Sequence, residues 1–69
     1  MNMPTGWIEL TLYQSGEPLY VLVSSITAVH DTCDGQYAVL DTERDQWSVR
    51  ESAREVIRRI LKAETEGKK

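Results

Sequence analysis

The feature that most constrains the fold of this chain is the segment 47–61, where a short apolar strand pattern runs into an amphipathic helix pattern. Ser52 followed by Glu55 matches a capping box, in which the hydroxyl and the carboxylate each bond a free backbone amide at the start of a helix. From Ala53 onward, apolar residues recur with the i, i+3, i+4, i+7 spacing of a helix with one buried side. We therefore predict a helix that starts at Ala53 and frays after Ala63. Its predicted buried residues are Val56, Ile57, Ile60 and Leu61.

Upstream of this helix, five short segments have the composition and alternation of β-strands. They are residues 7–13, 18–23, 26–30, 37–41 and 46–50. The connections are short and polar. Ser24 and Ser25 can turn the chain by bonding backbone groups, and Asp34-Gly35 suits the positive φ angles of a tight hairpin. Strands joined in this way favour an antiparallel meander. We predict an α+β fold, with a small antiparallel meander sheet of four to five strands followed by one C-terminal amphipathic helix.

The length of the chain indicates one domain with little stability in reserve. A chain of 69 residues buries only about 60% of the surface that its unfolded form exposes. Residues 7–63 are the predicted domain, 1–6 a flexible N-terminus and 64–69 a disordered tail. The single Cys33 excludes an internal disulfide, and one His with one Cys cannot complete a zinc site unless carboxylates join. We therefore expect self-association to provide the additional stability that a small core lacks.

The first two predicted strands are apolar on both faces. Ile8, Leu10 and Leu12 are expected to face the helix, so the alternate residues of these strands point the other way. One helix covers only part of one face, and strands that are apolar on both sides expect both sides to be covered. We predict that a second copy or a protein partner contacts the opposite face. The predicted contact residues are Trp7, Tyr13, Tyr20 and Leu22. The alternative is that these are ordinary, isolated surface aromatics.

The segment from His30 to Asp34 contains the only imidazole and the only thiol of the chain. Neighbours at a β-turn seldom hold the geometry of a nucleophile and its base, and His30 with Cys33 and one carboxylate matches no recognised metal spacing. The four glycines stand singly, so no phosphate-binding loop is present. We read the segment as a solvated hairpin turn and predict neither enzymatic activity nor a cofactor.

Charge is divided unevenly along the chain. Residues 1–49 hold seven acidic residues and one basic residue, whereas residues 50–69 hold seven basic and four acidic residues, so the two parts carry net charges of −6 and +3. The predicted helix contributes a row of basic residues away from its apolar side. They are Arg54, Arg58, Arg59 and Lys62. A small RNA- or DNA-binding regulator that uses this helix face is the alternative function. A solvated charged face is favoured, because Glu55 can pair with Arg59 and the whole chain is acidic.

Membrane insertion and export are not expected. No run approaches the roughly 20 apolar residues that a membrane span needs. Residues 1–6 have neither the basic start nor the apolar middle of a signal peptide. A lone thiol also suits a reducing compartment. We therefore expect a cytoplasmic location.

Several blocks of the sequence together resemble the FlbD-like family of small bacterial flagellar-operon proteins. They are Ile8-x-Leu10-Thr11, the Gly16 and Gly35 turns, a valine-rich second strand, Ile26-x-x-Val29, and Val49-x-Glu51-Ser52-x-x-Glu55-Val56-Ile57-x-x-Ile60. The resemblance covers about residues 7–62 and implies a short, non-enzymatic protein associated with flagellar motility, with no catalytic residues to carry over. The chain departs from the pattern in its extended N-terminus, its longer 41–46 loop and Trp47. A prophage-derived or uncharacterised relative would show the same pattern.

The carbon storage regulator family offers a second comparison, because its members are also short strands followed by a helix and bind RNA as intertwined dimers. The first predicted strand here reads Leu10-Thr11-Leu12-Tyr13 and lacks the paired arginines that this family places after its Leu-Thr. RNA binding therefore ranks second to a protein–protein interaction module that self-associates.

Overall fold

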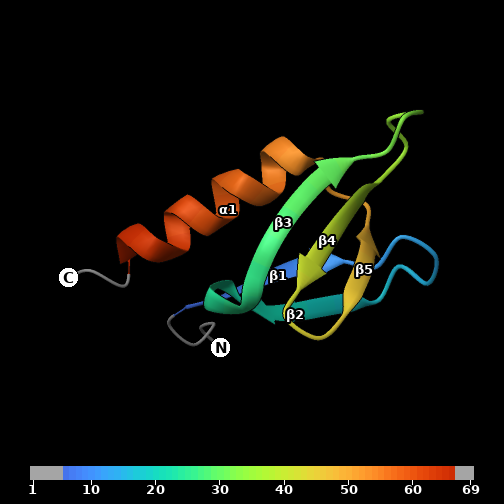
Figure 1. Cartoon of the computed structure of the whole chain (residues 1–69). Coiled ribbons are helices and arrows are strands. Elements are labelled where there is room, and N and C mark those ends of the chain that lie inside the picture. The colour runs from blue at the N-terminus through green and yellow to red at the C-terminus, as the bar shows by residue number, and fades with distance from the viewer. Residues whose placement is uncertain (1–5, 67–69) are drawn as a thin grey trace.

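The computed structural model describes residues 6–66 as five strands, one short 3-10 helix and one α-helix (Figure 1). In chain order these elements are β1 (Trp7–Thr11), β2 (Pro18–Leu22), η1 (Val23–Ser25), β3 (Ile26–Asp31), β4 (Ala38–Thr42), β5 (Gln46–Val49) and α1 (Ala53–Glu66). β1 and β2 form an antiparallel hairpin, and β3, β4 and β5 form an antiparallel three-stranded meander. The predicted α+β architecture is therefore confirmed.

The two sheets are joined at one corner, where β1 meets β5. Leu12 forms an antiparallel bridge with Val49. On either side of this bridge, the Tyr13 amide donates to the Ser48 carbonyl (2.9 Å) and the Arg50 amide donates to the Thr11 carbonyl (2.8 Å). The strands therefore follow the spatial order β2-β1-β5-β4-β3, and the predicted antiparallel meander is divided between two small sheets.

The second corner lies between β2 and β3, at the predicted Ser24–Ser25 turn. Here the chain forms η1, and the Ser25 hydroxyl donates a hydrogen bond to the Leu22 carbonyl (2.7 Å). This is the local side-chain to backbone bonding that serine favours at a turn. The corner sends β3 into the second sheet, so that the inner faces of the two sheets lie opposite each other.

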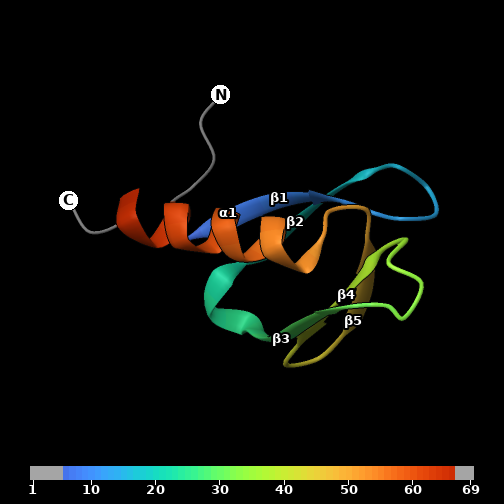
Figure 2. The same cartoon turned by 90° about the horizontal axis from the view of Figure 1, so that it is seen from above.

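The core lies between the two sheets and is closed by α1. Alternation along β1 supplies part of this core. Ile8 and Leu10 are buried, whereas Trp7 before them and Glu9 between them are exposed. Helix α1 packs against β1 and β3, one strand from each sheet, and so spans the two layers (Figure 2). The buried residues are Ile8, Leu10, Val21, Ala38, Leu40, Val49 and Val56.

The helix buries a narrower stripe than its sequence predicts. Val56 is fully buried and Ile60 is partly buried against the core, but Ile57 and Leu61 are 47% and 58% exposed. The residues of α1 that contact the core are Val56, Ile60 and Ala63. The main contacts of α1 are with β1 and β3, and the side of the helix that carries Ile57 and Leu61 is left exposed. The predicted burial of Ile57 and Leu61 is wrong.

The start of α1 is capped by two side chains. The Ser52 hydroxyl accepts a hydrogen bond from the Glu55 amide (3.2 Å), as the capping box predicts. The Glu55 carboxylate does not complete the box, because it turns to Arg59, whose Nε donates to it at 3.0 Å. Asp31, at the end of β3, supplies the second cap by accepting from the Ala53 amide (2.9 Å).

The far end of α1 lies beyond the predicted one. The helix continues to Glu66 rather than fraying after Ala63, and the Thr65 hydroxyl donates to the Leu61 carbonyl (2.9 Å) within its last turn. Of the predicted N-terminal segment 1–6, only Gly6 lies within the described residues, and of the predicted tail, residues 67–69 lie outside them. Within the described part of the chain, no helix has the length and apolar character needed to cross a membrane.

Candidate interaction surface

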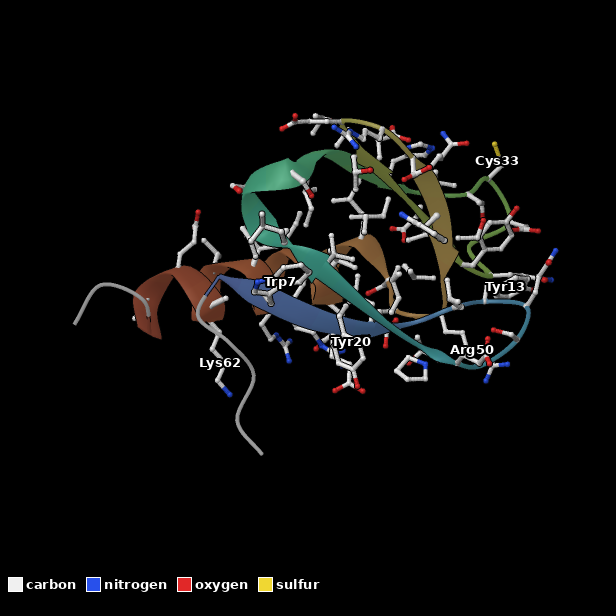
Figure 3. The ribbon with its side chains drawn as sticks, turned by 90° about the horizontal axis from the view of Figure 1, so that it is seen from below. Trp7, Tyr13, Tyr20, Cys33, Arg50 and Lys62 are labelled. Carbon is white, nitrogen blue, oxygen red and sulfur yellow. The ribbon has the colours of Figure 1, made fainter. Side chains whose placement is uncertain are left out.

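The outward face of the β1–β2 hairpin carries three large apolar side chains. The register places Trp7 opposite Leu22 and Glu9 opposite Tyr20. Since Ile8 and Val21 point into the core, these four side chains project outward. Trp7 and Leu22 are each 38% exposed and Tyr20 is 53% exposed, and Figure 3 shows Trp7 and Tyr20 over the same hairpin. We call Trp7, Tyr20 and Leu22 the outer patch.

Tyr13, the fourth predicted contact residue, lies apart from the outer patch at the far end of the hairpin (Figure 3). Its ring stacks on Tyr37 with the centroids 4.4 Å apart, and its hydroxyl donates a hydrogen bond to the side-chain Oε1 of Gln36 (3.2 Å). Tyr13 therefore joins the β1–β2 turn to the loop between β3 and β4. The structure brings together three of the four predicted residues, because the chain leaves regular strand geometry after Thr11.

Arg50 holds the same turn, and sequence reasoning missed it. Its Nε donates to the Tyr13 carbonyl (3.1 Å), and its guanidinium lies over Gly16. Gly16 has a φ of +76°, and a Cβ at this position would stand 3.2 Å from Arg50 Nη2. The only signal in the sequence is a glycine in a predicted turn, which does not reveal that an arginine at the end of β5 packs on it.

The surroundings of the outer patch are acidic. Glu9 is exposed on β1, opposite Tyr20. Leu22 also forms one wall of an adjoining cleft of about 340 Å³ between η1 and the β4–β5 turn. The other residues that line this cleft are Ser24, Ser25, Thr42, Glu43, Arg44 and Asp45. An apolar centre with three carboxylates and one guanidinium around it suits a partner that is apolar and basic.

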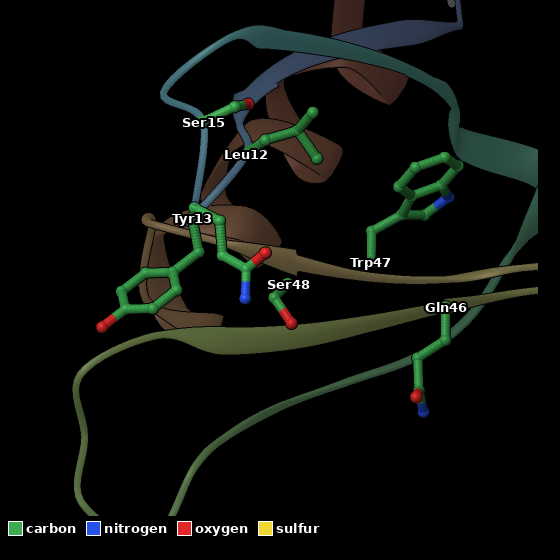
Figure 4. Close-up of a pocket in the computed structure, with 7 residues that line it drawn as sticks. Leu12, Tyr13, Ser15, Gln46, Trp47 and Ser48 are labelled. Atoms are coloured by element: carbon green, nitrogen blue, oxygen red, sulfur yellow. The ribbon is translucent and has the colours of Figure 1, made fainter.

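A second cleft, of about 300 Å³, opens between the β1–β2 turn and β5 (Figure 4). Trp47 supplies its aromatic wall and is itself partly buried against the core. Among the described residues that line this cleft, the polar groups are hydroxyls and side-chain amides. Its lining residues are Leu12, Tyr13, Gln14, Ser15, Gln46, Trp47 and Ser48.

The segment around Cys33 forms a hairpin loop whose polar groups serve the turn. Cys33 is exposed. The Asp34 carboxylate accepts hydrogen bonds from the Thr32 hydroxyl (2.6 Å) and the Gln36 amide (3.1 Å), and these bonds lower the pKa of Asp34. Of the predicted Asp34-Gly35 pair, only Gly35 has a positive φ (+71°). Across residues 6–66, no three His, Cys, Asp or Glu side chains converge on a point that would hold a metal ion.

A polar network ties β1 to the segment before α1. The Glu51 carboxylate accepts hydrogen bonds from the Thr11 amide and hydroxyl, both at 2.9 Å, and Arg59 Nη1 lies 3.4 Å from it. The same Arg59 nitrogen donates to the Glu9 carbonyl (2.7 Å). Burial alone would raise the pKa of Glu51, but the Thr11 bonds and the Arg59 charge outweigh it and lower that pKa.

This network changes the predicted basic face of the helix. Arg59 points back onto β1 and serves the fold, so it is not free to bind a partner. Arg54, Arg58 and Lys62 are exposed, and Arg58 makes only an exposed ion pair with Glu55 at 3.4 Å. Three of the four predicted residues therefore remain available on the surface of α1.

These features define a small α+β protein, two antiparallel sheets and a helix, with an exposed aromatic and acidic surface on one hairpin. Comparison with protein-family models, with curated proteins and with solved structures gives no match for the chain. The chemistry of its surface is therefore what bears on its function.

Proposed function

We propose that this protein is a non-catalytic protein–protein interaction module that associates with copies of itself through the outer patch. The observation that carries the proposal is the placement of Trp7, Tyr20 and Leu22 side by side on the outside of β1 and β2. Aromatic residues are enriched in the cores of protein interfaces and dominate their binding energy. A domain of this size also has a small core, and burying a further apolar face stabilises it.

The polar groups that catalysis would use are committed elsewhere or face solvent. Glu51 is bound by Thr11 and Arg59, and Asp34 closes the loop beside Cys33. His30 and Cys33 are both exposed. This distribution supports a module whose contribution is contact rather than reaction.

A charge placed in the outer patch tests the proposal. Leu22→Glu puts a carboxylate where a second copy would otherwise bury an apolar side chain, so we expect sedimentation velocity to show assembly for the natural chain and monomer for the variant. Gln14→Glu adds the same charge in the exposed β1–β2 turn, away from the outer patch, and is expected to assemble as the natural chain does. A natural chain that sediments as a monomer at high micromolar concentration would refute self-association.

The setting of this module is a second proposal. The resemblance of residues 7–62 to the FlbD-like family supports a motility-associated or prophage-derived role in the cytoplasm. Affinity purification of the tagged chain from a motile host is expected to recover a component of the motility apparatus. The Leu22→Glu variant tests whether such recovery depends on the outer patch.

Nucleic-acid binding is the alternative function, and the exposure of Arg54, Arg58 and Lys62 along α1 favours it. Its test is the fluorescence anisotropy of labelled RNA and duplex DNA titrated with the protein. Phosphate contacts predict that the logarithm of the binding constant falls with the logarithm of salt, by about 0.7–0.9 for each phosphate neutralised. Replacing all three residues with Glu is expected to abolish such binding, and a flat salt response would exclude it.

A further inference from the structure

The exposed side of α1 carries a second apolar surface. Ile57 and Leu61 are one helical turn apart, and both are about half exposed. Arg54 and Arg58 lie beside them at i, i+3 spacing, so the four side chains form one contiguous group on the helix. We call Arg54, Ile57, Arg58 and Leu61 the helix flank. Its centre is apolar and its border is positively charged.

The helix flank and the outer patch match in composition and are opposite in charge. The outer patch has an apolar centre beside Glu9, and its adjoining cleft adds the carboxylates of Glu43 and Asp45 against the single guanidinium of Arg44. Placing the outer patch against its own copy would bring carboxylates together, and placing the helix flank against its own copy would bring guanidinium groups together. Like charges brought face to face at an interface are unfavourable.

The two surfaces cannot satisfy each other within one chain. The opposite side of α1 is fixed in the core by Val56 and packs against β1 and β3. The outer patch lies on the solvent side of β1 and β2, across that hairpin from the core residues Ile8 and Val21. The helix flank and the outer patch can therefore contact each other only between two molecules.

From these contacts we propose that the helix flank of one copy docks on the outer patch of the next, so that self-association is head-to-tail. The occupant of the outer patch is then a second copy of this chain, chosen by its charge complementarity, and this proposal rests on the self-association proposed above. A head-to-tail contact leaves one unused surface at each end of the pair, so assembly continues until a ring closes or a filament grows.

Two variants that each block one surface test this arrangement. Leu22→Glu blocks the outer patch and leaves the helix flank intact, while Leu61→Glu does the reverse at a position that is 58% exposed. Each variant alone is expected to be monomeric, with association weakened about tenfold or more, as for the loss of one buried anchor. An equimolar mixture is expected to form 1:1 dimers and to stop there, because each pair retains one working contact.

Light scattering after size-exclusion chromatography distinguishes the outcomes, and circular dichroism checks that each variant is folded. Tyr20→Glu is a second block of the outer patch, at a more exposed position, should Leu22→Glu fail to fold. Suppose that Leu61→Glu assembles as the natural chain does, and that Leu22→Glu stays monomeric when the two variants are mixed. The interface then joins two outer patches. That result overturns the head-to-tail arrangement and leaves self-association standing. A monomeric natural chain overturns both.

The charges can be tested separately from the apolar contacts. Arg54→Glu with Arg58→Glu reverses the border of the helix flank, and Glu9→Lys with Glu43→Lys reverses the charge beside the outer patch. Each double variant alone faces a like-charged surface and is expected to lose assembly. A chain that carries all four changes has complementary surfaces again and is expected to regain it. Failure of the fourfold variant to assemble while it remains folded would overturn the charge pairing.

Discussion

At the scale of single residues, Glu51 is the polar group on which the arrangement of β1 and α1 most depends. Its carboxylate satisfies both polar groups that Thr11 presents and also faces Arg59. Its side chain is 12% exposed, so these bonds form in a partly desolvated place where charge-assisted hydrogen bonds are strong. The residue lies between β5 and α1, and its contacts reach back to β1 at the start of the chain.

The folded state lowers the pKa of Glu51 below its ordinary value of 4.5, so its contribution to stability depends on pH. A carboxyl with a lowered folded-state pKa stabilises the protein above its unfolded pKa, and this stabilisation is lost as the pH falls through the folded-state value. We expect Glu51→Gln to lower the free energy of unfolding by about 1 kcal/mol at neutral pH.

The difference between Glu51→Gln and the natural chain is expected to shrink as the pH falls below 4.5, where the natural carboxyl becomes protonated. Urea unfolding followed by circular dichroism at several pH values measures it. Glu17→Gln removes a carboxylate in the exposed β1–β2 turn and serves as the control. A difference that stays constant down to about pH 3 would show that the charge of Glu51 is not what stabilises the fold.

At the scale of elements, much of the fold could be predicted from local pattern. The alternation of Ile8 and Leu10 with polar neighbours predicts β1, and the spacing from Ala53 with Ser52 before it predicts where α1 begins. These signals are local because each depends on a repeat within one element. The burial of each element against another was less predictable, because it depends on how many strands lie beneath it.

The helix shows that limit most clearly. Sequence spacing assigns Ile57 to the same stripe as Val56, but α1 packs mainly against β1 and β3, and in that arrangement Val56 is buried while Ile57 is 47% exposed. The capping of α1 by Asp31 could not be predicted either, because it needs the end of β3 beside the start of the helix. The candidate surface was predicted in part, since Tyr13 belongs to a turn that Arg50 and Tyr37 hold in place.

The unequal burial of α1 predicts unequal effects of truncation. Val56→Ala removes two methyl groups from a fully buried position and is expected to lower the free energy of unfolding by about 2 kcal/mol. Ile57→Ala removes more carbon from a half-exposed position and is expected to lower it by less than about 0.5 kcal/mol.

Chemical denaturation at low protein concentration measures both values without a contribution from association. The two variants act as controls for each other, because they are neighbours with similar helix propensities. If both variants lower the free energy of unfolding equally, α1 is rotated about its own axis relative to the arrangement described above.

At the scale of the whole molecule, the division of charge along the sequence becomes a division in space. The acidic residues beside the outer patch come from a strand and a turn, whereas three of the five exposed basic residues in the described part of the chain, Arg54, Arg58 and Lys62, come from α1. A molecule with opposite charges on separate faces orients its neighbours before they touch. The small core gives a physical reason for such neighbours, since each docking event buries further apolar surface.

This charge division predicts that assembly weakens with salt. We expect the dissociation constant to rise as sodium chloride increases from about 50 mM to about 500 mM, because screening shortens the reach of exposed charges. Sedimentation velocity across the series measures it, with Leu22→Glu as the monomeric reference. Assembly that strengthens with salt would indicate an interface held by apolar contact alone.

The bridge between Leu12 and Val49 also sets the order in which the fold can be completed during synthesis. The β1–β2 hairpin can form soon after it leaves the ribosome, because its partners are close in sequence. One edge of β1 nevertheless stays open until β5 has been made, and Thr11 waits longer still for Glu51. A nascent chain that has not yet reached Val49 and Glu51 therefore exposes an unpaired strand edge beside Leu12, the kind of edge at which partly folded chains aggregate.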